Sequence, residues 1–97
     1  MNLSDYSFHD AAILKVTEYT ANQTIEFLLD FPVNWEENLF EHRILRFKDV
    51  TSYNLKEIPF SGNITILDIT GSKNKAELIT NAGNRFIEFS TCELIKP

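Results

Sequence analysis

The apolar and polar residues of this chain alternate as they do in β-strands. Between residues 24 and 31, large apolar side chains recur at every second position, with Leu28 as the exception among the intervening residues. The recurring residues are Ile25, Phe27, Leu29 and Phe31. A period of two sends neighbouring side chains to opposite faces, so the pattern predicts a strand with one buried face. Residues 12–19 precede it across a turn containing Asn22, which predicts an antiparallel hairpin.

Four more strands are predicted farther along the chain, at residues 43–50, 64–70, 76–81 and 85–95. In the last of these, the apolar positions change parity between Phe89 and Cys92. A β-bulge adds one residue to a strand, so a bulge near Ser90 and Thr91 would reconcile the two parities.

Two stretches lack a strand pattern. Asn34 and Glu37 have the spacing of a minimal capping box, which predicts one helical turn or a loop over residues 32–38. Residues 51–62 contain Pro59, which bars a long helix, and are predicted to be a connection that packs on the core.

These patterns predict a single β domain spanning residues 1–97. No segment of ten or more residues has a period of 3.6, and we find no internal repeat. A chain of 97 residues is too short for two separate cores, and its 43% apolar residues suffice for one. We therefore predict an all-β, mainly antiparallel fold of about six strands. They would form a small sandwich or a partly open barrel, with at most a short helical turn.

The cysteine content and the first residues predict a cytoplasmic protein. Cys92 is the single cysteine, so neither a disulfide within the chain nor a cysteine-based zinc site can form. The first residues lack the basic and apolar regions of a secretory signal, and no apolar run approaches the ~20 residues that span a bilayer. We expect Cys92 to be a buried structural residue.

The net charge of −5 is unevenly distributed. Residues 1–41 contain eight acidic residues and one lysine, whereas the remaining 56 contain six acidic and eight basic residues. An acidic surface repels nucleic acids and anionic membranes and attracts a basic protein. The distribution therefore disfavours nucleic-acid and membrane partners. It agrees with either a solubilising face or a surface selected by a basic protein partner.

Candidate catalytic residues are few. His9 and Asp10 are adjacent, so on a strand their side chains point to opposite faces, and only in a turn could they converge. His42 is the other histidine, and no spacing of histidines, carboxylates or glycines matches a metal or phosphate site. We assign no catalytic residue, no metal and no cofactor. His9, Asp10 and His42 remain structural residues or the lining of a candidate pocket.

Trp35 is the most informative residue of the predicted 32–38 loop. It is the single tryptophan and lies beside Glu36 and Glu37, with Glu41 close by. Tryptophan on a loop is a favoured interface anchor, because a large rigid surface is buried at small entropic cost. The alternative is that Trp35 covers an open end of the β-structure. The candidate partner-binding residues are Trp35, Glu36, Glu37 and Glu41.

Several short elements resemble a group of small bacterial β-rich proteins, some of which are immunity proteins of polymorphic toxin systems. These elements are Phe8-His9-Asp10 before the first strand, a hairpin, Arg43 and Phe47 in R-x-x-x-F, and Phe86-Ile87-Glu88-Phe89. The resemblance implies a cytosolic protein that neutralises a toxin by binding it. It implies no catalytic residues, and an acidic surface would suit a basic toxin.

Three functions remain open. The first is a non-enzymatic cytoplasmic protein-binding module, such as an immunity protein. The second is a small enzyme or ligand-binding domain with a pocket around His9 and His42. The third is a structural subunit that forms a homodimer through an edge strand, since an open sheet has edges to cover.

Overall fold

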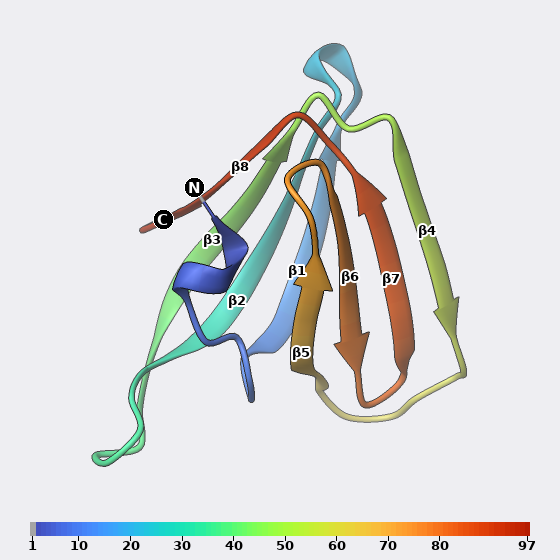
Figure 1. Cartoon of the computed structure of the whole chain (residues 1–97). Coiled ribbons are helices and arrows are strands. Elements are labelled where there is room, and N and C mark those ends of the chain that lie inside the picture. The colour runs from blue at the N-terminus through green and yellow to red at the C-terminus, as the bar shows by residue number, and fades with distance from the viewer. Residues whose placement is uncertain (1) are drawn as a thin grey trace.

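The computed structural model describes residues 2–97, which form eight antiparallel strands and two short 3-10 turns (Figure 1). The strands are β1 (Ala12–Tyr19), β2 (Thr24–Asn34), β3 (Leu39–Lys48), β4 (Ser52–Glu57), β5 (Ile64–Gly71), β6 (Lys75–Thr80), β7 (Gly83–Glu88) and β8 (Thr91–Ile95). The turns are η1 (Leu3–Asp5) and η2 (Thr20–Asn22). The prediction of an all-β antiparallel fold is confirmed, whereas the prediction of about six strands is wrong.

The eight strands form one open sheet in the order β4-β7-β6-β5-β1-β2-β3-β8. Its centre is narrow, because β1 pairs with β5 only at Ala12 and Ile13. This narrow pairing divides the sheet into a β1 half (β1, β2, β3 and β8) and a β5 half (β5, β6, β7 and β4). The two edges, β4 and β8, are open.

The core lies between the two halves, which face each other. Phe27 of β2 makes an edge contact with Tyr53 of β4, with ring centroids 5.9 Å apart. The buried cluster draws apolar side chains from both halves, and it includes Ile25, Phe27, Leu29, Leu45, Phe47, Ile66, Leu78, Ile87, Phe89 and Cys92. The alternating apolar residues of β2 are all buried, as their period of two predicts.

The two additional strands arise where the sequence pattern is ambiguous. Residues 51–62 contain the edge strand β4, whose Leu55 is exposed, so apolar residues do not mark a buried face there. Residues 85–95 form two strands, with Phe89 and Ser90 crossing from one half to the other. The change of apolar parity therefore marks the passage of the chain from β7, which pairs with β6 and β4, to β8, which pairs with β3. The predicted bulge at Ser90 and Thr91 is wrong.

Two turns differ in detail from the sequence prediction. In the β1–β2 turn, Gln23 rather than Asn22 has the left-handed backbone, with φ 52°. Residues 35–38 form a hairpin turn, which agrees with the loop alternative of the prediction, and Asn34 caps it as predicted, but residues 32–34 belong to β2. The register shifts instead at Leu14 of β1, Val33 of β2 and Leu67 of β5, as at β-bulges.

The topology contains an internal repeat that is not visible in the sequence. The sheet order is unchanged when β1–β4 are exchanged with β5–β8 and the order is read from the other end. The registers agree as well. Val16, Phe27, Leu45 and Leu94 are neighbours across the β1 half, and Ile69, Leu78, Arg85 and Leu55 are neighbours at the same places in the β5 half. The two units are thus related by a pseudo-two-fold axis through the β1–β5 pairing.

Each unit donates its fourth strand to the other half. The two connections that carry out this exchange hydrogen bond to each other, Thr51 N–H to the Glu88 carbonyl and Ser90 N–H to the Lys48 carbonyl, both at 3.0 Å. Reciprocal backbone bonds fix both crossings without requiring particular side chains. This explains how the repeat persists between units of dissimilar sequence.

One element breaks the symmetry between the units. Leu29 and Arg43 pair in the β2–β3 hairpin where Thr80 and Gly83 pair in β6–β7. The β6–β7 hairpin closes directly beyond that pair, whereas β2 and β3 continue through residues 30–42, which we call the β2–β3 arm. The arm projects from the body of the molecule (Figure 1).

Candidate binding surface on the β2–β3 arm

The end of the β2–β3 arm is held by hydrogen bonds of the turn itself. The Asn34 side-chain oxygen accepts the Glu37 N–H at 3.1 Å, and the Trp35 carbonyl accepts the Asn38 N–H at 3.2 Å. Asn38 has φ 53°, a backbone conformation that asparagine tolerates. These bonds give Trp35, Glu36 and Glu37 a defined position at the end of the arm.

Apolar side chains are exposed on the arm. Trp35 is 49% exposed, and Val33 and Leu39 beside it are also exposed. Phe31, nearer the body, is buried and contacts Phe8 edge to face with ring centroids 5.6 Å apart. The base of the arm therefore belongs to the core, whereas its end presents apolar surface to solvent.

Trp35 stacks on His9, although 26 positions separate them in the sequence. The two ring centroids are 6.0 Å apart, with an interplanar angle of 24°. His9 is in turn fixed by its Nδ1, which lies 2.8 Å from the Leu67 carbonyl oxygen of β5. Because a carbonyl only accepts, the His9 Nδ1 carries the proton. The end of the arm is thus tied to the β5 half through His9.

His9 and Asp10 lie in the turn that enters β1, where their side chains can meet. The Asp10 carboxylate is 3.5 Å from His9 Nε2, and the Asp10 N–H donates to the Ile66 carbonyl at 2.8 Å. Asp10 has φ 70°, a left-handed conformation in which aspartate is several-fold enriched. The arrangement fixes a turn and supports Trp35. Within residues 2–97, the contacts of His9 run to Trp35, Leu67 and Asp10 rather than to a nucleophile.

The remaining predicted site residues lie elsewhere on the arm. Glu41 pairs with Arg43 at 2.9 Å, so its charge is partly neutralised. His42 lies opposite Asp30 in the β2–β3 ladder, and is not among the contacts of His9 in the described chain. Glu36 and Glu37 therefore carry the acidic character of the turn. The stacking of His9 on Trp35 was missed because no local pattern joins the two positions.

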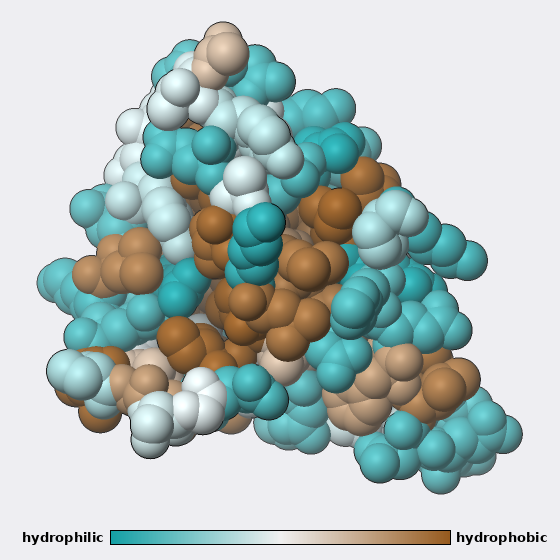
Figure 2. All heavy atoms as spheres, turned by 180° about the vertical axis from the view of Figure 1, so that it is seen from behind, coloured by the Kyte–Doolittle hydropathy of each residue, from teal (hydrophilic) through white to brown (hydrophobic). Residues whose placement is uncertain are grey.

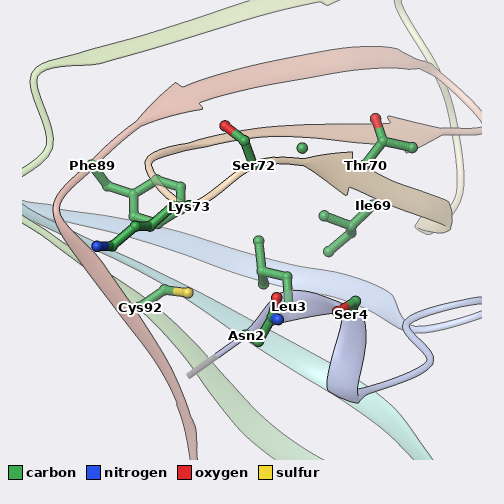
Figure 3. Close-up of a pocket in the computed structure, with 10 residues that line it drawn as sticks. Asn2, Leu3, Ser4, Ile69, Thr70, Ser72, Lys73, Phe89 and Cys92 are labelled. Atoms are coloured by element: carbon green, nitrogen blue, oxygen red, sulfur yellow. The ribbon is translucent and has the colours of Figure 1, made fainter.

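A separate cavity of about 680 Å³ lies between η1, the β5–β6 turn and the start of β8 (Figure 3). Leu3 points into it, and Ile69, Phe89 and Cys92 form part of its wall. Burial raises the pKa of the Cys92 thiol, so the thiol remains protonated at neutral pH and is a poor nucleophile. Within residues 2–97, no group of three or more histidine, cysteine or carboxylate side chains is placed to hold a metal ion.

One cluster of charged side chains connects the strands in each half. On the outer face of the β1 half, Arg46 donates to Glu26 at 2.6 Å and to Glu93 at 2.9 Å, and Lys48 lies 3.3 Å from Glu93. In the β5 half, Arg85 is buried and donates to both carboxylate oxygens of Glu57. Both clusters connect neighbouring strands, so they contribute to structure.

Comparison with protein-family models, with curated proteins and with solved structures gives no match to this chain. In the part of the chain that the structure describes, no helix has the length and apolar character needed to cross a membrane.

Proposed function

We propose that this chain is a non-enzymatic protein-binding module that contacts its partner through the end of the β2–β3 arm. The carrying observation is a half-exposed Trp35 on an element that the other unit of the fold lacks. The stacking on His9 and the Asn34 bond hold Trp35 in place before binding, which lowers the entropic cost of association.

The chemistry of the turn supports a basic partner. Glu36 and Glu37 directly follow Trp35, and the acidic residues of the chain are concentrated in its first 41 residues. Carboxylates beside an apolar anchor favour Lys and Arg on the partner and speed association. An immunity protein that neutralises a basic toxin in the bacterial cytoplasm is the form of this proposal that the sequence resemblance favours.

The experiment uses the proteins encoded by the neighbouring genes, each tested for direct binding to the purified chain by calorimetry. Trp35→Ser and the double variant Glu36→Lys/Glu37→Lys should each weaken binding by at least about tenfold, the scale of an interface anchor. The matched controls are Phe60→Ser and Glu88→Lys, which change an exposed aromatic residue and a half-exposed carboxylate away from the arm.

Equal affinity of the wild type and the arm variants for such a partner would exclude the arm as the contact surface. Binding by none of the neighbouring proteins would contradict the immunity-protein form of the proposal.

A further inference from the structure

The pseudo-two-fold axis relates two openings between the halves of the sheet. One opening lies between β5 and β8, where Ile69, Cys92 and Leu94 face the core side. The corresponding residues on the other side are Val16 of β1 with Tyr53 and Leu55 of β4, and we call this second opening the β1–β4 groove. The two openings are bounded by equivalent strands. The segment that covers one opening therefore indicates what kind of segment the other can accept.

The β5–β8 opening is covered by the chain's own N-terminal segment. Leu3 packs against the core there and points between β5 and β8 (Figure 3). Phe8, at the other end of the segment, is buried against Phe31. A short segment with two apolar anchors therefore covers this opening, and the cavity of about 680 Å³ lies between it and the strands. Under it, Leu94 is partly buried.

The β1–β4 groove has no such cover within residues 2–97. Leu55, the counterpart of Leu94, is 48% exposed, and a cavity of about 400 Å³ lies at one end of the groove, lined in part by Ile25, Val50 and Tyr53. Figure 2 shows the side of the molecule opposite η1, and apolar side chains gather in its middle. Contiguous exposed apolar surface of this kind usually marks an interaction site.

The groove also has an acidic residue, whereas the charged residue that lines the cavity of the covered opening is Lys73. Glu18 lies opposite Ile25 in the ladder, so it is on the core-facing side of β1, where the β5 half has Gly71. It is the one charged residue among the eight described residues that line the cavity. Ile25, Val50 and Tyr53 line this cavity together with polar side chains, so a carboxylate at its mouth favours a ligand with an apolar side chain next to a Lys or Arg.

The free backbone of β4 adds a third element of recognition. β4 is an edge strand, paired with β7 on one side only. Its other side has unpaired N–H and C=O groups, which can accept an added extended strand. A peptide in the groove can therefore combine backbone hydrogen bonds with an apolar anchor and a salt bridge.

We propose that the β1–β4 groove binds a short peptide segment of a partner protein, with an apolar anchor between Val16 and Leu55 and a Lys or Arg beside Glu18. This site is distinct from the β2–β3 arm and does not depend on the function proposed for it.

The test uses a synthetic peptide that copies, with one change, the segment filling the equivalent opening. Its sequence is Lys-Leu-Ser-Asp-Tyr-Ser-Phe, which is residues 2–8 with lysine in place of Asn2, because Asn2 lines the cavity near Gly71, the counterpart of Glu18. Titration into the ¹⁵N-labelled full chain is expected to give saturable shifts of the Val16, Tyr53 and Leu55 amides. A peptide with serine in place of leucine is the control ligand.

Variants separate this groove from other surfaces. Leu55→Lys and Glu18→Lys should each weaken peptide binding by about tenfold or more, as expected for loss of a buried anchor or its charge partner. Leu67→Lys, which changes an equally exposed leucine on β5, and Trp35→Ser on the arm should leave it unchanged. Glu18 is exposed, so its variant keeps the test valid if Leu55→Lys fails to fold.

Three results would overturn the proposal. The first is no saturable shift at millimolar peptide, and the second is equal affinity of the wild type and Glu18→Lys. The third is shifts confined to Ile69 and Cys92, which would mean that the peptide displaces the chain's own segment instead.

Discussion

Arg85 and its symmetry counterpart differ in chemical character. Arg85 faces the core where the other unit has Leu45, and it is held by a two-pronged bond to Glu57 at 2.8 and 3.1 Å and by the Tyr53 hydroxyl at 3.1 Å. Burial lowers the pKa of Arg85, but its bonds to Glu57 and Tyr53 outweigh that effect and the net pKa is raised. The guanidinium therefore stays charged inside the fold, and its cost is offset only while Glu57 is present.

Replacing Glu57 by alanine should destabilise the chain more than replacing Arg85 by methionine. Glu57→Ala leaves a buried guanidinium without its counter-ion, which costs about 3–5 kcal/mol of unfolding free energy. Arg85→Met leaves the Glu57 carboxylate unpaired, but that carboxylate lies on the edge strand β4 and is more exposed than the guanidinium, 13% against 8%, so the cost of this variant should be smaller. Urea denaturation measures both, and an equal or reversed ranking would show that the pair is not the source of the effect.

Glu93 should make the stability depend on pH in the acid range. Hydrogen bonds from Arg46, and then from Lys48, lower the pKa of Glu93 below its ordinary value of 4.5. The unfolded chain then binds the proton more readily than the folded chain, so this contribution is complete above about pH 4.5 and is lost as the pH falls through the lower, folded pKa.

The variant Glu93→Gln tests this dependence, because glutamine does not titrate. Its unfolding free energy should fall less steeply below pH 4.5 than that of the wild type, although it is lower at pH 7. Urea midpoints measured from pH 7 to pH 3 give both slopes. Parallel curves for the two proteins would contradict the assignment.

At the scale of elements, the β2–β3 arm depends on contacts outside its own hairpin. His9→Ala removes the ring that stacks on Trp35 and should cost about 0.5–1 kcal/mol. Because Trp35 is the single tryptophan, its emission reports on the arm alone. The emission maximum should move to longer wavelength in His9→Ala and remain unchanged in the control variant His42→Ala. An unshifted maximum in His9→Ala would show that the stacking does not persist in solution.

The Asn34 cap should stabilise the arm measurably. Asn34→Ala removes the acceptor of the Glu37 N–H, and loss of one hydrogen bond of this kind costs about 1 kcal/mol. Asn34→Asp keeps an acceptor and should retain most of the stability. Thermal unfolding distinguishes the two variants, and equal losses would indicate that solvent satisfies the Glu37 N–H.

The elements that could be predicted from sequence are those with a local signal. The alternation in β2 and the Asn34-Glu37 spacing depend on neighbours in the chain, and the structure shows both as predicted. β4 was missed because an edge strand has no fully buried face to mark it. The crossing at Phe89 and Ser90 was missed because, in the sequence, a change of neighbouring strand has the same apolar pattern as a bulge. The stacking of His9 on Trp35 requires knowledge of the tertiary fold.

At the scale of the whole molecule, the exchange of β4 and β8 brings the first and last strands together in the β1 half, whereas the β5 half is the continuous segment of residues 52–88. β8 supplies Cys92 and Leu94 to the core and covers the edge of β3. A chain that ends at Ser90 should therefore lose cooperative unfolding, because removing two packed apolar residues costs about 4 kcal/mol or more, comparable with the stability of a small domain. Removal of Lys96 and Pro97 alone, both exposed, should have little effect. Circular dichroism during thermal unfolding distinguishes the outcomes.

The position of β8 in the sequence also determines when the protein can fold during its synthesis. β3 is complete at Lys48, but β8, which pairs with its other edge, ends only at Ile95. At about 5–20 residues per second, a ribosome leaves the edge of β3 unpaired for several seconds. During that interval Leu45 and Phe47 lack the strand that completes their face of the core. The nascent chain is thus most prone to aggregation in the interval before β8 emerges, and the β1 half can be completed only after β8 has been synthesised.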